Sequence, residues 1–211
     1  MTEYRQLYFT AAETAMSLVS DPAVVASWDK PSALHDFSVA GLAGHIVHQF
    51  VRVGDALAAG EAGEPIPVVE HFARSAWVQA GVDDESNVSV RRGGEAAGAA
   101  GHAALLERAQ GLLDQQRAAL PGEPADRVVL LPWAGWSLLL DDFLLTRLME
   151  LVVHADDLAS SVGVPTPEFP AAVTEPVVDL LAKLSVHRHG PTAVVRALSR
   201  TERAPAAISA F

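Results

Sequence analysis

The chain has 211 residues, half of them hydrophobic, and its 26 acidic and 15 basic residues give a formal net charge of −11. This length suits one domain with a C-terminal extension, and the acidic balance argues against nucleic acid or anionic membranes as partners. Because the chain has no cysteine, any sulfur chemistry needs a thiol supplied by a small molecule. The N-terminus lacks a signal-peptide layout and no apolar run reaches the length of a membrane span, so we expect a soluble cytoplasmic protein.

The beginning of the chain shows the apolar periodicity of helices, with clear signals for where each helix ends. Residues 4–19 predict a first helix that ends before Asp21. A second helix is predicted over about 39–59, because Ser38 is a good N-cap and apolar residues follow at helical spacing. Gly60 then ends this helix.

The middle of the chain is less regular. Within residues 61–97 we expect a short helix around 68–79, followed by an exposed loop that includes 81–87 and the Arg-Arg-Gly-Gly stretch 91–94. A third long helix is predicted over about 97–119, ending at Pro-Gly.

The remaining elements lead to a prediction of the fold. Residues 127–140 favour either a short hairpin or an extended crossover, and a fourth helix is predicted over about 141–161. Two shorter helices are expected near 170–187 and 191–199. Four main helices with one long connection predict an all-α four-helix bundle over residues 1–165, with a helical C-terminal extension over residues 166–211 packed on it.

A carboxylate and an imidazole stand one turn apart in the predicted fourth helix, among residues typical of a protein core. Glu150 and His154 are separated by four residues, so their side chains lie on one helix face. A buried carboxylate needs a strong partner, and carboxylate oxygen and imidazole nitrogen are both ordinary zinc ligands. The pair alone is also consistent with a plain ion pair or hydrogen bond.

A third ligand has to come from a distant segment, and His45 is the best candidate. It lies three residues after Leu42 in the apolar stripe of the second predicted helix, so we expect it to face the interior. His45, Glu150 and His154 together would leave one position open for water or substrate, as in catalytic zinc sites. His48 is a possible substitute ligand, although its direction is turned away from that of His45.

Several other residues near these ligands have two interpretations each. Arg147, one turn before Glu150, could orient that carboxylate or bind an anionic substrate or cofactor, or form only an intrahelical ion pair. Asp157, one turn after His154, could accept a hydrogen bond from the imidazole or make a structural contact at the helix end. Trp133 and Trp136 could line the mouth of a pocket or pack in the interior. His35, His71 and His102 receive no role.

Both ligand-bearing stretches resemble signatures of one known family, the mycothiol-dependent maleylpyruvate isomerase N-terminal domain family. The upstream resemblance rests on Trp28, Pro31, Ser38, Val39, Leu42 and His45. Downstream, residues 147–159 contain a pattern similar to the family's Glu-x-x-x-His-x-x-Asp-Leu motif. The resemblance covers residues 1 to about 165, and it implies a DinB-like metal-binding four-helix bundle.

The resemblance also implies a metal site and a cofactor. Carried over residue by residue, it makes His45, Glu150 and His154 the ligands of a divalent metal, usually Zn²⁺, and mycothiol the thiol cosubstrate. The catalytic isomerase has an additional C-terminal α/β domain, for which residues 166–211 are too short and too helical. Another small electrophile is therefore at least as consistent with this chain as maleylpyruvate.

The leading hypothesis is a metal-dependent and mycothiol-dependent enzyme that acts on a small electrophile as an isomerase or S-transferase. Its partners would be a small-molecule thiol, the electrophile and possibly a second copy of the chain in a homodimer. One alternative is a non-catalytic DinB-like protein that binds metal or a small ligand. In another alternative, the three residues form only a structural hydrogen-bonded cluster.

Overall fold

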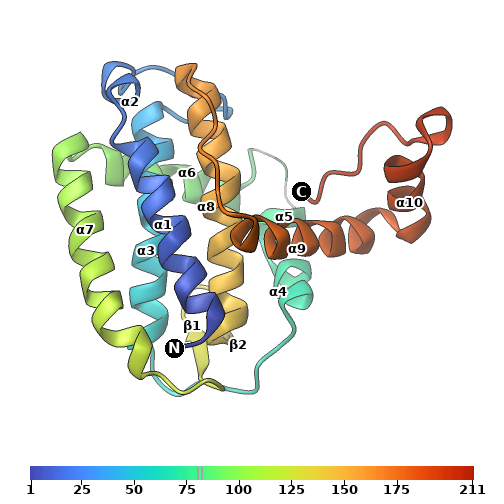
Figure 1. Ribbon diagram of the computed structural model, residues 1–211, viewed down its shortest axis with the longest axis horizontal. Helices are drawn as coiled ribbons and strands as arrows, with labels where there is room; N and C mark the ends of the chain where they lie inside the picture. Colours follow the sequence, from blue (N-terminus) through green and yellow to red (C-terminus); the bar gives the residue numbers. More distant parts are fainter. Residues whose placement is uncertain (80, 82) are drawn as a thin grey trace.

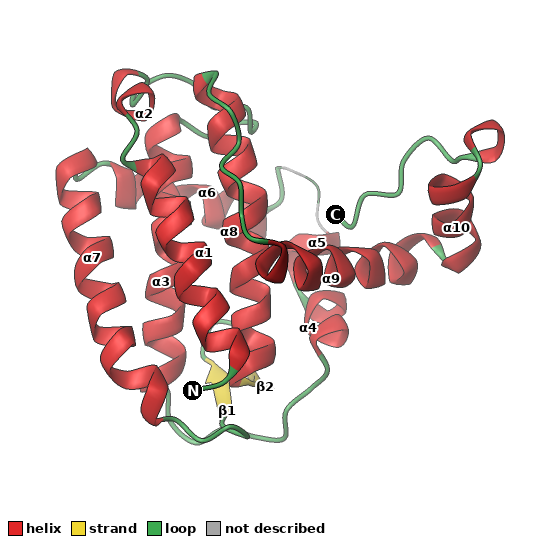
Figure 2. Ribbon diagram, in the orientation of Figure 1, coloured by secondary structure: helices red, strands yellow, loops and turns green. Residues whose placement is uncertain are grey.

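The computed structural model describes every residue of the chain except 80 and 82, which both fall within the predicted irregular region. Four long helices in the described part of the chain form a bundle (Figure 1), namely α1 (Glu3–Val19), α3 (Val39–Ala58), α7 (His102–Ala119) and α8 (Leu140–Val162). Figure 2 shows that helices dominate and that one small hairpin lies at the end of the bundle near the N-terminus. The predicted all-α, DinB-like bundle class is confirmed.

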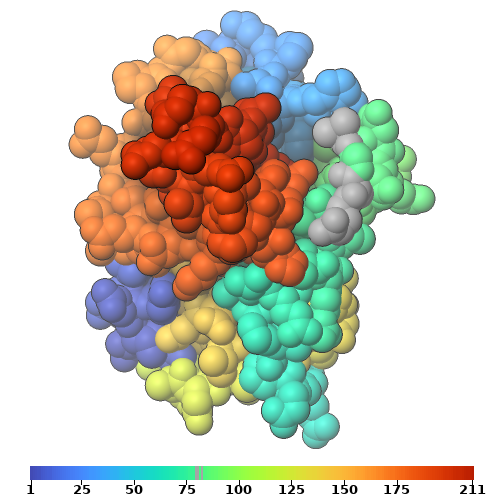
Figure 3. All heavy atoms as spheres, turned by 90° about the vertical axis from the view of Figure 1, so that its right-hand side faces the viewer, coloured from blue at the N-terminus to red at the C-terminus, as the bar shows by residue number. Residues whose placement is uncertain are grey.

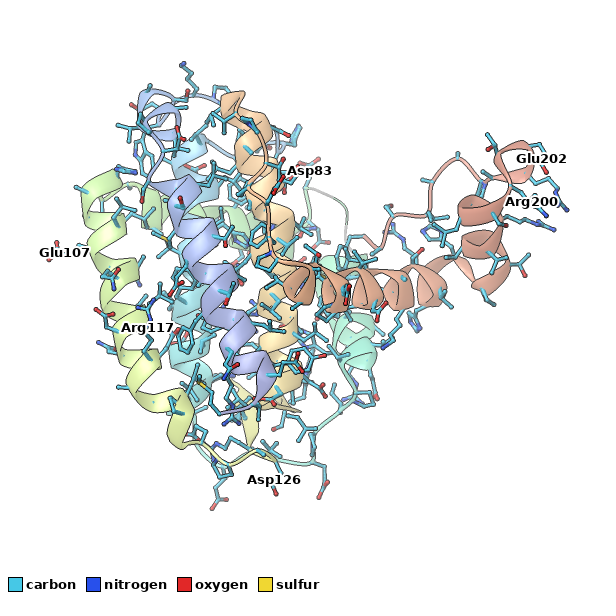
Figure 4. All side chains as sticks on the ribbon, viewed as in Figure 1. Asp83, Glu107, Arg117, Asp126, Arg200 and Glu202 are labelled. Carbon is cyan, nitrogen blue, oxygen red and sulfur yellow. The ribbon has the colours of Figure 1, made fainter. Side chains whose placement is uncertain are left out.

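The core fills the space between these four helices. α3 packs against α7 and α8, and α1 packs against α8. Large aromatic side chains are fully enclosed there, including Tyr8, Phe50 and Phe143. Charged side chains such as Glu107 and Asp126 lie instead at the periphery (Figure 4). Within the described residues, no helix is both long and apolar enough to cross a membrane.

The ends of α3 and α8, the two helices that carry the candidate ligands, follow the sequence signals. Ser38 caps α3, because its hydroxyl oxygen accepts a hydrogen bond from the backbone N–H of Gly41 at 2.8 Å. α8 ends at Gly163, whose positive φ of 73° allows a left-handed C-cap. Of the two alternatives for residues 127–140, the hairpin is correct, since β1 (Val128–Leu131) pairs antiparallel with β2 (Trp136–Leu139).

The predicted exposed loop over 81–87 and 91–94 is largely wrong, because α6 spans Glu85–Gly98. Asp84 caps this helix by accepting a hydrogen bond from the backbone N–H of Ser86 at 3.1 Å. Gly94, one of the glycines that suggested a loop, serves close packing against α3. A Cβ atom on Gly94 would lie 2.5 Å from the carbonyl oxygen of Gly41.

Other helix boundaries also differ from the prediction. The third long helix was expected from about residue 97, but α7 begins at His102, because residues up to Gly98 belong to α6. The short helix expected near 68–79 is divided into α4 (Val68–Arg74) and α5 (Ala76–Gln79). The remaining short helices are α2 (Pro22–Ala26) and the 3-10 turns η1 (Leu120–Gly122) and η2 (Thr201–Arg203).

The C-terminal residues form two helices, as predicted, α9 (Ala171–His189) and α10 (Pro191–Ser199). α9 packs against α1, α4 and α8, and α10 lies at the far end of α9 (Figure 1). In Figure 3 this segment, orange to red, covers much of one face of the molecule. The division into a bundle over 1–165 and an extension over 166–211 stays a prediction.

Candidate metal centre

Three side chains from distant parts of the sequence meet between α3 and α8. The Nε2 atom of His45 lies 3.4 Å from Oε2 of Glu150, and Nε2 of His154 lies 3.3 Å from the same oxygen. The two imidazole rings are nearly perpendicular, with centroids 4.6 Å apart. The structure therefore brings together His45, Glu150 and His154, the three residues that the sequence placed in one site.

The fold explains this meeting in simple terms. Glu150 and His154 share one face of α8 because they are four residues apart, and α3 packs along α8. His45 belongs to the buried face of α3, together with Leu42 and Ile46. The exposed fractions of the three side chains are 11% for His45, 12% for Glu150 and 20% for His154, so the cluster is largely shielded but still reachable.

The geometry of the cluster fits a divalent cation. Two ligand atoms that each lie about 2.05 Å from zinc in a tetrahedral arrangement are about 3.4 Å apart. The two separations from the Glu150 oxygen, 3.4 and 3.3 Å, agree with that value. One other group of possible ligands occurs in the described residues, formed by His35, Asp36 and Asp83, but all three are exposed.

Glu150 is an ionised carboxylate in the interior. Burial opposes its ionisation, but hydrogen bonds with His154 and His45 and the positive charge of Arg147 hold its pKa well below the usual value. In His45 the effect of burial is the larger one. The pKa of its imidazole is lowered, because burial lowers it more than the contact with Glu150 raises it. The cluster thus offers one carboxylate and one neutral imidazole.

The second imidazole is held by carboxylates on both sides. Nδ1 of His154 lies 2.9 Å from Oδ2 of Asp157, so of the two interpretations of Asp157 the hydrogen bond to the imidazole is present. Although burial favours the neutral ring, the hydrogen bonds to Asp157 and Glu150 raise the pKa of His154 to about 9. A carboxylate that accepts from one nitrogen of a histidine orients the other nitrogen, which is how many metal-binding histidines are held.

Arg147 does not form the intrahelical ion pair that was one interpretation of its spacing from Glu150. In the described part of the chain, none of its guanidinium nitrogens lies within 4.0 Å of a carboxylate oxygen. Instead, Nη1 donates to Oε1 of Gln49 on α3, and Nε donates to the hydroxyl of Thr146 at 3.0 Å. The side chain reaches across to α3, and its charge influences Glu150 without direct contact.

Gln49 is the residue that the sequence interpretation missed. Its side chain is buried, with 2% exposure, one turn after His45 on α3. The amide nitrogen lies 3.1 Å from Nε2 of His45 and 3.1 Å from the carbonyl oxygen of the same residue. A polar residue four positions after a proposed ligand, within an apolar stripe, was the available signal.

His48 lies outside the cluster, in agreement with its predicted direction. Burial, followed by the nearby charge of Arg52, lowers the pKa of His48 to about 4.

Trp133 and Trp136, for which the sequence allowed either a pocket mouth or interior packing, make different contacts. The indole N–H of Trp136 donates to Nδ1 of His71 at 3.0 Å. Trp133 is 37% exposed, and the guanidinium of Arg52 lies 4.2 Å from the centre of its ring. His71, for which the sequence suggested no role, is 5% exposed and close enough to Arg147 and Glu150 for both charges to act on it.

Comparisons with known proteins support the family that the motifs suggested. A family described as the mycothiol maleylpyruvate isomerase N-terminal domain matches residues 9–159. No curated protein and no solved structure matches the chain. The matched segment extends from α1 to α8 and contains the whole cluster, and the family associates the chain with mycothiol. The chain belongs to the mycothiol maleylpyruvate isomerase N-terminal domain family.

Proposed function

We propose that this protein is a metal-dependent enzyme that uses a low-molecular-weight thiol, mycothiol, to act on a small electrophile, as an isomerase or S-transferase. The observation that carries the proposal is the meeting of His45, Glu150 and His154, with donor atoms within 4.8 Å of one another in a shielded site. Membership in a mycothiol-associated family supports the choice of thiol.

In this proposal, His45, Glu150 and His154 hold the cation, most simply Zn²⁺, and leave one coordination position open. A cation bound there would lower the pKa of a thiol in the open position and so supply a nucleophile near neutral pH. Asp157 holds the ring of His154 in the orientation that presents Nε2. Arg147 adds positive charge beside the site, which favours an anionic substrate.

The chain contains no cysteine, so the thiol has to come from outside. Addition of the thiol to a conjugated double bond, followed by rotation and release, would be isomerisation. Retention of the thiol would be S-transfer.

Metal analysis tests the ligand set directly. After expression in medium supplemented with zinc, we expect close to one equivalent of metal in the purified protein and a large loss in His45→Ala, because three protein ligands become two. His48→Ala is the matched control on the same helix and should keep its metal. A wild-type protein without stoichiometric metal, or a His45→Ala variant with full occupancy, contradicts this ligand set.

Turnover separates an enzyme from a binding protein. The metal-loaded protein is incubated with mycothiol and a panel of electrophiles that includes maleylpyruvate, and both thiol loss and isomerisation are followed. We expect activity on at least one electrophile that disappears in Glu150→Ala. Full metal occupancy without turnover across the panel would favour the non-catalytic binding protein.

A further inference from the structure

The buried amide of Gln49 has its orientation fixed by Arg147. An arginine side chain can only donate hydrogen bonds, so the atom of Gln49 that faces Nη1 of Arg147 is the oxygen. The amide nitrogen must then face the opposite way, toward His45. Reversing the amide would place two donors against each other in the interior, which is unfavourable.

The two N–H groups of this amide have two acceptors, and both belong to His45. One acceptor is the carbonyl oxygen of His45, at 3.1 Å, and the other is its Nε2 atom, also at 3.1 Å. Because the amide nitrogen is a donor, it bonds to Nε2 of His45 only in the tautomer in which Nε2 offers a lone pair and the imidazole proton lies on Nδ1, whereas in the other tautomer Nε2 donates to Glu150 instead. The same Nε2 atom is the one that faces Glu150 across 3.4 Å.

A single lone pair cannot serve both a metal and the amide. When a cation takes the lone pair of His45 Nε2, one N–H of Gln49 loses its acceptor. A buried donor without an acceptor is costly, and Gln49 is only 2% exposed, so water cannot readily replace the lost partner. The freed N–H lies beside the coordination sphere and needs an acceptor there.

We propose that Gln49 donates this N–H to the sulfur of the external thiol in the open coordination position, and that Arg147 is the positioning residue that holds the amide for it. The inference rests on the proposed function and adds a specific thiol-binding contact to it. The hydrogen bond stabilises negative charge on sulfur and therefore favours the bound thiolate over the free thiol.

Cobalt-loaded protein provides the test, with 2-mercaptoethanol as the probe. This thiol carries no charged group apart from its sulfur, so a change in its binding reports on the sulfur itself. Two dissociation constants are measured, that of Co²⁺ by competition with a chelator, and that of the thiol from the sulfur-to-cobalt absorption band. The variants are Gln49→Leu, Arg147→Met and the double variant. Gln116→Leu is the matched control, because Gln116 is also 2% exposed but bonds to Tyr8 and the Phe50 carbonyl.

For Gln49→Leu we expect thiol binding weakened by about tenfold, while Co²⁺ binding is unchanged or tighter. Tighter metal binding is reasonable because the amide no longer competes for the lone pair of His45. Arg147→Met should also weaken thiol binding, and the double variant should lose little more than Gln49→Leu alone, since Arg147 acts through Gln49. Gln116→Leu should leave the dissociation constants of both Co²⁺ and the thiol unchanged.

The opposite results overturn the proposal. Weaker Co²⁺ binding with unchanged thiol binding in Gln49→Leu would mean that Gln49 only supports His45. Additive losses in the double variant would mean that Arg147 acts on the thiolate directly. If the wild-type protein binds no Co²⁺, or binds it without binding the thiol, the proposed function itself fails, and that result is distinct from any difference between the variants.

Discussion

Glu150 remains charged in the interior because each of its neighbours favours the ionised form. His154 and His45 approach the same carboxylate oxygen, and Arg147 contributes positive charge from one turn away. Asp157 in turn holds His154 from the other side of the ring. The cluster therefore depends on residues beyond its three possible ligands.

Asp157→Asn tests this dependence at the level of one residue. The substitution removes the negative charge that orients and polarises His154, so we expect metal affinity to fall by about 10- to 100-fold. Zinc affinity is measured by competition with a chelating dye. Asp156→Asn is the control, because Asp156 is exposed and bonds to Thr166 instead. Equal affinities in the two variants would contradict the role of Asp157.

His71 gives a prediction for the pH dependence of stability. Burial, and then the charge of Arg147, lowers its pKa from 6.5 to about 4. Between pH 6.5 and pH 4, His71 binds a proton in the unfolded chain but stays neutral in the folded protein. The contribution of His71 to the free energy of unfolding is therefore fully present above about pH 6.5 and is lost as the pH decreases toward 4. It amounts to at most about 3 kcal/mol.

The comparison of wild type with His71→Gln measures this contribution. Glutamine does not titrate and can still accept the hydrogen bond from Trp136. Urea unfolding at several pH values between 7.5 and 4 should show a smaller loss of unfolding free energy in His71→Gln than in wild type. Parallel curves for the two proteins would show that His71 does not remain neutral in the folded state.

At the scale of elements, α6 fixes the position of the helix that carries His45. Glu95 on α6 accepts hydrogen bonds from the backbone N–H and the hydroxyl of Ser38 at 2.7 and 2.8 Å, at the N-cap of α3. The backbones of α3 and α6 approach closely at Gly44 and Gly94, where a Cβ atom would collide with the opposite backbone. The proposed ligand His45 is thus aligned by a helix that contributes no residue to the cluster.

Adjacent glycines on α6 allow a matched test of this packing. In Gly94→Ala the new Cβ atom would lie 2.5 Å from the Gly41 carbonyl oxygen, so α3 and α6 must separate, at a cost of about 1–3 kcal/mol. In Gly93→Ala the new methyl group meets nothing within 4 Å, and the free energy of unfolding should rise by about 0.5–1 kcal/mol. Chemical denaturation of both variants checks that the two changes in unfolding free energy have opposite signs. A Gly94→Ala protein as stable as the wild type would contradict the close approach of α3 and α6.

At the scale of the whole molecule, α9 shares the core of the bundle although it follows the segment matched by the family. Val173, Val177, Leu180 and Leu184 of α9 are buried and belong to the same apolar cluster as the bundle residues. The chain beyond α10 returns to this region, where the ring of Phe211 lies 5.6 Å from that of Phe72 on α4. We therefore expect the bundle and α9 to unfold together.

Neighbouring valines on α9 test that expectation. Val177 is 1% exposed and Val178 is 61% exposed. Val177→Ala should lower the unfolding free energy by about 2 kcal/mol, through lost apolar burial and the cavity left behind, and Val178→Ala by less than about 0.5 kcal/mol. Thermal unfolding is followed by near-UV and far-UV circular dichroism. Separate transitions at the two wavelengths, with only one shifted by Val177→Ala, would indicate that α9 unfolds independently.

The sequence by itself determined the parts of this protein that depend on local spacing. The apolar stripes, the Ser38 cap and Gly163 predicted α3 and α8 closely, because helix periodicity and end signals act within a few residues. The i, i+4 spacing of Glu150 and His154 placed both on one face. Local spacing also offered the hydrogen bond between His154 and Asp157, as one of two interpretations of Asp157.

Only the tertiary structure decided which distant groups meet. α6 was mistaken for a loop because Gly93 and Gly94 weaken a helix locally, whereas packing against α3 requires Gly94. Arg147 contacts Gln49, 98 residues away, instead of pairing with Glu150 on its own helix. Such contacts depend on how α3 and α8 are placed in space, and helix periodicity along one segment contains no information about its neighbour.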